Sequence, residues 1–97
     1  MAINKVDYDV LEQASTTYGN EAAAIDDVIR KLDSMNGTLQ EGWQNQTAEA
    51  FINRYETEHK KALMAARDSI NEISQYIKNY RAKAIDNDTE GANAVRG

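Results

Sequence analysis

The chain of 97 residues contains no cysteine and no proline. Without cysteine it forms no disulfide bond, and cysteine usage does not indicate whether its compartment is oxidising or reducing. Without proline, no residue interrupts a long helix by withholding a backbone N–H donor. No segment approaches the roughly 20 consecutive apolar residues that a membrane span needs. The first ten residues, MAINKVDYDV, lack the apolar region of a cleaved secretory signal. These absences favour a helical protein with no stable membrane insertion and no cleaved signal peptide.

Basic residues are fewer than acidic ones, 11 against 16, and the net charge is −5 at pH 7. Such a surface repels phosphates and anionic lipids, so we expect no nucleic-acid partner. No serine lies in a nucleophile elbow, and no glycine-rich loop is present to hold a phosphate. His59 is the only histidine, which is too few ligands for a zinc site. The sequence therefore predicts a protein that is not an enzyme and binds no metal or cofactor.

The first half of the chain has apolar residues at heptad spacing, which is typical of a long helix in a bundle. One track of residues seven apart consists of Leu11, Tyr18, Ile25, Leu32 and Leu39. A second track, offset by three, contains Ala14, Val28 and Met35 and is interrupted only by Glu21. Asp7 is the expected N-cap and Gly42 the expected stop. The pattern predicts a helix over about 7–40.

The second half repeats this pattern and predicts a helix over about 47–85. Its apolar positions alternate mainly by three and four residues: Ile52, Tyr55, His59, Leu63, Ala66, Ile70, Ile73, Ile77, Tyr80 and Ala84. The last residues, DNDTEGANAVRG, contain one isolated valine and no periodicity. We therefore predict a flexible C-terminal tail over 86–97.

Two long helices joined by a short turn, over about 41–46, must run antiparallel. The predicted fold is thus an all-α helix-turn-helix hairpin, folded about Trp43 so that Ala22, Ala23 and Ala24 lie opposite Ala62, Leu63 and Ala65. The apolar stripe is wider than one seam, which favours dimerisation into a four-helix bundle over a monomeric hairpin. The residues expected to form the hairpin and dimer core are Leu11, Tyr18, Ile25, Val28, Leu32, Leu39, Phe51, Ile52, Tyr55, Leu63, Ile70, Ile73 and Ile77.

The turn itself carries the segment GWQNQTAEAF, which holds the only tryptophan and the only phenylalanine. Trp43, Gln44 and Asn45 lie between two matched helices of a chain of about 100 residues, and Phe51 follows on the second helix. This arrangement resembles the WXG100 (ESAT-6-like) family of type VII secretion substrates. Asn45 stands where the family has glycine. Asparagine either tolerates the left-handed conformation there or caps the next helix.

The resemblance implies a protein that is cytoplasmic before export and is secreted without a cleaved signal peptide. It also implies recognition by the type VII secretion ATPase, often through a tyrosine followed four residues later by an acid. Here Tyr80 is followed at that spacing by Ala84, and the nearest acids are Asp86 and Asp88. These three residues, Tyr80, Asp86 and Asp88, are the candidate secretion signal.

Three functions remain open from the sequence. The first is a small secreted protein that forms a homodimer and acts by binding other proteins. The second is an adaptor that pairs with a WXG100-like helical partner or with the helical domain of a larger exported toxin. The missing acid after Tyr80 favours this adaptor, because the partner could supply the signal. The third is a cytoplasmic helical scaffold unrelated to secretion.

Overall fold

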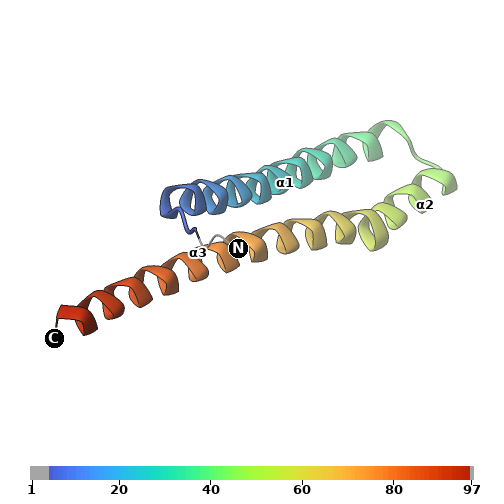
Figure 1. Ribbon diagram of the computed structural model, residues 1–97. Helices are drawn as coiled ribbons and strands as arrows, with labels where there is room; N and C mark the ends of the chain where they lie inside the picture. The colour runs from blue at the N-terminus through green and yellow to red at the C-terminus, as the bar shows by residue number, and fades with distance from the viewer. Residues whose placement is uncertain (1–4, 97) are drawn as a thin grey trace.

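The computed structural model describes residues 5–96, and the side chains as far as residue 87. Helix α1 spans Tyr8–Gly42, and α2 spans Gln46–Arg54. A short π-helix, η1, covers Tyr55–His59, and α3 spans Lys60–Arg96. Because α2, η1 and α3 follow one another directly, they form a single second helix antiparallel to α1 (Figure 1). This architecture confirms the predicted all-α hairpin, and residues 5–96 contain no strand.

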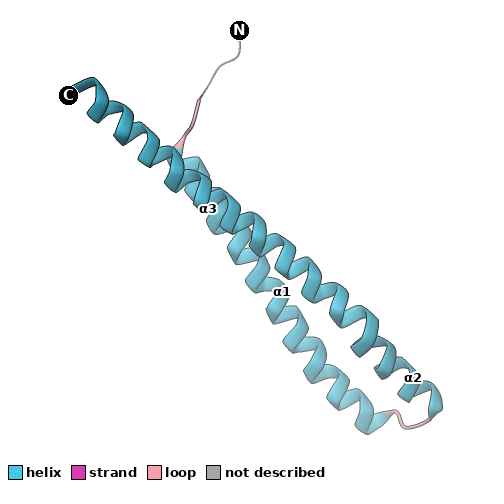
Figure 2. Ribbon diagram, turned by 90° about the horizontal axis from the view of Figure 1, so that it is seen from below, coloured by secondary structure: helices cyan, strands magenta, loops and turns pink. Residues whose placement is uncertain are grey.

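The hairpin is long and narrow, with principal dimensions of 75 × 23 × 21 Å. With 35 residues, α1 is about 52 Å long at 1.5 Å per residue. The second helix is longer than α1, and its end projects beyond the first turn of α1 (Figure 2). One helix–helix seam therefore accounts for nearly all tertiary packing.

Local signals explain both ends of α1. The Asp7 carboxylate accepts hydrogen bonds from the backbone N–H groups of Asp9 and Val10, at 3.1 and 3.2 Å. These bonds satisfy donors that the first helical turn leaves unpaired. At the other end, the helix stops at Gly42, and Trp43 is already extended, with φ −141°.

The second helix ends later than the sequence predicted. Its expected end was about residue 85, whereas α3 continues as helix to Arg96. The flexibility expected for 86–97 stays a prediction. The physical reason is that apolar periodicity reports which residues are buried, not which are helical. A helix satisfies its backbone hydrogen bonds internally, and this segment has no proline to stop it. Residue 97 lies outside the described range.

The seam has small polar residues near its middle. The Ser74 hydroxyl donates a 2.6 Å hydrogen bond to the backbone carbonyl of Ser15, and both residues are buried. Nearby, a Cβ added to Gly19 would lie 3.4 Å from the Ser74 Oγ, so the two backbones approach closely here. Ala22 and Ala23, predicted to lie opposite Ala62, Leu63 and Ala65, instead line one hollow with Arg67, Asp68 and Asn71. The turn lies between Gly42 and Gln46, so its centre is beyond Trp43.

Candidate protein-interaction site

Asn45 joins the turn to the second helix as an N-cap. Its backbone is extended, with φ −162° and ψ 179°, and its side chain accepts a 2.8 Å hydrogen bond from the N–H of Ala48. No residue in the described range has a positive φ. The turn therefore has no position that requires glycine. Of the two roles that the sequence left open, capping is therefore the one observed. The asparagine replaces the family's glycine without strain.

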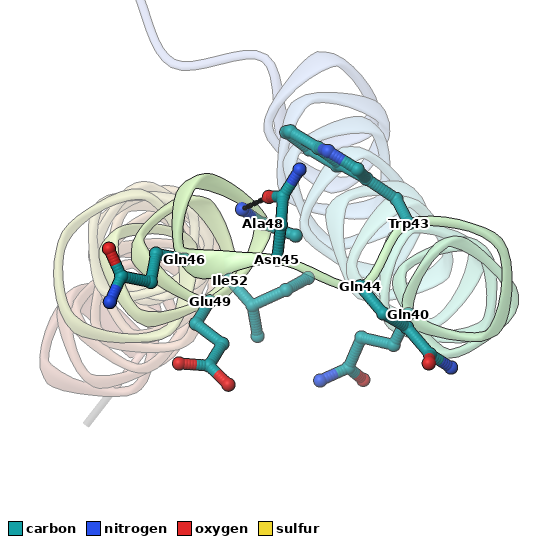
Figure 3. Close-up of a pocket in the computed structure, with 8 residues that line it drawn as sticks. All are labelled: Gln40, Trp43, Gln44, Asn45, Gln46, Ala48, Glu49 and Ile52. Carbon is teal, nitrogen blue, oxygen red and sulfur yellow. Dashed lines mark hydrogen bonds between the residues drawn. The ribbon is translucent and has the colours of Figure 1, made fainter.

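Trp43 and Phe51 pack against one another across the turn, with ring centroids 5.7 Å apart and planes inclined by 47°. Trp43 is half-buried, whereas Phe51 keeps 44% of its surface exposed. Beside them lies an open cleft of about 470 Å³. Its lining consists of Gln40, Trp43, Gln44, Asn45, Gln46, Ala48, Glu49 and Ile52 (Figure 3). Amide groups dominate this cleft, so it suits hydrogen bonding to a protein backbone better than acid–base chemistry.

We expect Asn45→Ala to lower the free energy of unfolding by about 1 kcal/mol, because the Ala48 N–H loses its acceptor. Asn45→Asp keeps an acceptor oxygen and should stay within about 0.5 kcal/mol of the native protein. Urea unfolding followed by circular dichroism measures both. Equal losses in the two variants would contradict the capping role.

One flank of the seam carries ion pairs and backbone hydrogen bonds, and we call it the polar side. Lys60 lies 3.0 Å from Asp33, and Arg67 lies 2.7 Å from Asp26. Arg81 donates a 2.9 Å hydrogen bond to the carbonyl of Tyr8. The nearby carboxylates raise the pKa of Lys60 and of Arg67, so both cations are charged at neutral pH.

Sequence reasoning missed this flank, because apolar periodicity does not report which cations pair across the seam. The signal is visible in retrospect: Lys60, Arg67, Ser74 and Arg81 are each seven residues apart. The first, second and fourth are long cations that reach across to α1, and the third makes the buried contact with Ser15. This heptad track aligns the two helices of one chain with each other.

The π-helix η1 is needed because the second helix contains one extra residue relative to the heptad pattern. Positions facing α1 are separated by three or four residues, except for five between Tyr55 and Lys60. The backbone N–H of Lys60 donates to the carbonyl of Tyr55, which is the wide turn of a π-helix. This wide turn keeps the side chains of Tyr55 and Lys60 facing α1. The Tyr55 hydroxyl lies 3.4 Å from Asp33, and burial together with this carboxylate raises the pKa of Tyr55.

The opposite flank leaves large apolar residues exposed, and we call it the apolar side. Its exposed members are Val10, Tyr18, Val28, Leu32, Met35, Phe51, Ile73 and Tyr80. Near the turn, it contains a groove of about 470 Å³. The groove is lined by Leu32, Asn36, Phe51, Tyr55, His59, Ala62 and Leu63. An apolar surface of this extent is typical of a protein-interaction site.

The thirteen residues expected in the core fall into three groups. Tyr55 is buried, and a larger group is half-buried: Leu11, Ile25, Leu39, Ile52, Leu63, Ile70 and Ile77. The remaining five, Tyr18, Val28, Leu32, Phe51 and Ile73, are exposed. The hairpin thus has a thin core, with Ala22, Ile29, Ala48 and Tyr55 as the buried apolar residues of the described part. The exposed five belong to the apolar side.

The accessible surface of one chain is unusually large for its mass. It measures 7651 Å² for 10.9 kDa. A compact monomer of this mass has about 5,600 Å². The difference reflects the elongated shape of the single hairpin, in which each helix keeps much of its surface exposed.

The three residues of the candidate secretion signal all lie on α3. Tyr80 is 47% exposed, and Asp86 is exposed. The side chain of Asp88 lies outside the described residues. Ala84, where the family pattern has an acid, is half-buried, and its carbonyl accepts a 3.3 Å hydrogen bond from the Tyr8 hydroxyl. The residue one turn after Tyr80 therefore contacts α1 through its backbone carbonyl and carries no carboxylate.

No helix of the described residues is apolar over a stretch long enough to span a membrane. Among the same residues, no group of three histidine, aspartate or glutamate side chains is placed to hold a metal ion.

These features define a class: small helical hairpins with a tryptophan turn, a polar seam and one uncovered apolar side. The chain belongs to the WXG100 family, described as proteins of 100 residues with WXG, whose pattern matches residues 4–89. The resemblance inferred from Trp43, Gln44, Asn45 and the two helices is thereby confirmed.

Known relatives agree with this assignment. The chain is 25% identical over 92 residues to an uncharacterized protein of Clostridium acetobutylicum, covering 95% of each chain. In structure it is similar to EsxA of Geobacillus thermodenitrificans, with a TM-score of 0.79 and 28% sequence identity. That comparison covers 94% of this chain and 100% of EsxA.

Proposed function

We propose that this protein is exported by a type VII secretion system as a folded dimer of hairpins, and that it acts by binding other proteins. Membership of the WXG100 family supports export. The observation that carries the binding role is the apolar side, which a single chain leaves exposed. Its partner in this proposal is a second copy of the chain, which completes a four-helix bundle.

Physical considerations favour such a dimer over a free hairpin. The seam of one chain buries few large side chains, and two helices alone rarely supply enough core for a stable fold. Covering Val28, Leu32, Phe51 and Ile73 removes the 38–44% of each residue that is still exposed, which contributes about 1 kcal/mol per residue. The polar side is already satisfied by its own ion pairs, so it does not compete for the partner.

An adaptor role is the second candidate, and one observation favours it. Ala84 occupies the position where an export signal often has an acid, and Asp86 lies two residues later. In this version a helical domain of a larger exported protein covers the apolar side and supplies the recognition element. The same surface serves both proposals, but the partner differs.

Export is tested by comparing culture supernatants of wild-type cells and cells that lack the type VII ATPase. We expect the protein only in the wild-type supernatant, with a cytoplasmic control protein absent from both. Appearance in neither supernatant, while the protein accumulates in cells, would contradict export. A chain truncated after Ala84 should remain helical and dimeric but stay inside the cell, because the segment beyond the Tyr8–Ala84 contact is proposed to be read by the ATPase.

Sedimentation of the purified chain then separates the two candidates. A homodimer sediments at twice the mass of 10.9 kDa, whereas an adaptor without its partner sediments as a monomer.

A further inference from the structure

The sequence contains one Asn-Gly dipeptide, formed by Asn36 and Gly37, and it lies inside α1 rather than in a turn. The backbone of Gly37 is helical without a positive φ, and a Cβ added to it would meet nothing within 4 Å. Neither backbone conformation nor packing therefore requires glycine at this position. Relative to alanine, a glycine inside a helix weakens the local folding equilibrium about fivefold.

An asparagine followed by glycine is prone to deamidation. The backbone nitrogen of the glycine attacks the side-chain Cγ of the asparagine, so that a new N–C bond forms and the Cγ–Nδ2 bond breaks. Ammonia leaves with the proton of the attacking amide. Water then opens the resulting succinimide ring and gives aspartate or isoaspartate. Glycine favours the attack, because a Cβ on the second residue would hinder the approach.

The side chain of Asn36 is placed where this reaction changes a surface. It is half-buried and lines the groove of the apolar side together with Leu32, Phe51 and Tyr55. Within the described part of the chain it makes no hydrogen bond that would hold its amide group in place. In a closed helix, however, each backbone N–H points along the axis to the carbonyl four residues earlier. The attack by the nitrogen of Gly37 therefore requires the helix to open locally.

The end of α1 that follows Gly37 is held weakly. Among residues 38–42, Leu39 has the one side chain that is half-buried, and the others are exposed. The last turn has no basic residue, and Glu41 places a carboxylate near the negative end of the helix dipole. The helix then passes directly into the extended Trp43, without a left-handed cap. Such an end opens more readily than the middle of a helix.

We propose that Asn36 is a deamidation site whose reaction depends on opening of the end of α1, and that the reaction removes the groove. Aspartate at this position places a carboxylate beside Leu32 and Phe51, which disfavours apolar contacts there. Isoaspartate carries the main chain through the side-chain carbon, so the helical hydrogen bonds cannot continue through it. Helix α1 then ends before Leu39, and the groove loses its α1 wall.

The consequence for binding rests on the proposed function, whereas the reaction itself does not. A partner that covers the apolar side also covers this groove. A chain that has reacted thus loses part of its binding surface, and the loss is irreversible because the ammonia has left. Deamidation limits how long an unpartnered chain stays able to bind.

Mass spectrometry and peptide mapping of the purified chain during incubation at 37 °C and pH 8.0 follow the reaction. We expect conversion at Asn36 before any at Asn20 or Asn79, which are exposed but are not followed by glycine. G37A should slow conversion at position 36 by at least about fivefold, because alanine strengthens the helix and its Cβ hinders the attack. Conversion at Asn36 no faster than at Asn20, or an unchanged rate in G37A, would overturn the site.

A charge change at the end of α1 tests the dependence on helix opening. E41K leaves the dipeptide intact and should slow conversion by about twofold or more, because a cation in the last turn favours the closed helix. E72K makes the same charge change on an exposed residue of α3 and should leave the rate unchanged. Equal rates in E41K and E72K would contradict control by the end of α1.

Chromatography separates the isoaspartate form, on which the loss of the groove is measured. We expect its backbone amides at 37–42 to exchange hydrogen at least about tenfold faster than those of the unreacted chain. Its dimer dissociation constant, measured by analytical ultracentrifugation, should rise by about tenfold or more. Unchanged exchange would overturn the structural effect, and an unchanged constant would overturn the effect on binding. A native chain that stays monomeric would instead contradict the proposed homodimer, while mass and exchange still decide the modification site.

Discussion

Tyr55→Ala is expected to destabilise the protein by about 3 kcal/mol or more, and so to unfold a large fraction of it at 37 °C. Tyr55 is the largest buried residue of the described core, with only 6% of its surface exposed. Its ring packs in the seam where the π-helix joins α2 to α3, and few other large side chains are buried in this seam. For a chain of this length, such a loss lowers the melting temperature by at least about 12 °C.

Tyr55→Phe is the matched control, because it keeps the ring and removes only the hydroxyl that lies 3.4 Å from Asp33. Asp33 retains its contact with Lys60, so the expected loss is about 1 kcal/mol or less. Thermal unfolding measured by circular dichroism at a fixed protein concentration compares the variants, since a dimer's melting temperature depends on concentration. Similar melting temperatures for Tyr55→Ala and the native protein would show that the seam does not depend on this ring.

The second large effect concerns association. We expect the double variant Val28→Glu/Ile73→Glu to weaken the dimer by at least about 100-fold, because it places two carboxylates per chain in the interface proposed for the apolar side. Both side chains are about 40% exposed in the single chain, at 44% and 40%, so the hairpin itself accommodates the charges at its surface. Sedimentation velocity over a range of concentrations measures the change.

The control for this experiment carries the same added charge elsewhere on the same helices. Asn20→Glu/Ala65→Glu changes two exposed residues, one on α1 and one on α3. Each lies nine residues, or two and a half helical turns, from a residue buried in the seam (Ile29 and Ser74), so it points outward. This double variant should leave the dissociation constant within about threefold of the native value, since it adds no group to the interface. Equal weakening by both double variants would mean that net charge, rather than the apolar side, controls association.

Local sequence signals anticipated much of the hairpin for physical reasons that operate over a few residues. The carboxylate of Asp7 and the glycine at position 42 mark the two ends of α1, because capping and helix termination depend on neighbouring backbone groups. Heptad spacing indicated two long helices, and the short turn between them requires the helices to run antiparallel. The pattern around Trp43 was also enough to recognise the family.

The candidate site was only partly visible in the same way. The sequence identified the apolar residues of the interaction surface, but it placed Tyr55 and Val28 in one undivided core. The structure separates them, since Tyr55 is 6% exposed and Val28 is 44% exposed. The extra residue at the π-helix also makes Lys60, Arg67 and Arg81 face α1. Whether a cation on a helix is solvated or paired depends on what lies opposite, and spacing along one helix does not report that.

The sequence by itself determined the helices, the turn and the family, since propensity, capping and periodicity are properties of neighbouring residues. Only the tertiary structure decided that η1 absorbs one residue between Tyr55 and Lys60. It also decided which flank of the hairpin is polar and which stays apolar. These outcomes depend on how two helices align, and that alignment follows from contacts between residues as far apart as Tyr8 and Ala84.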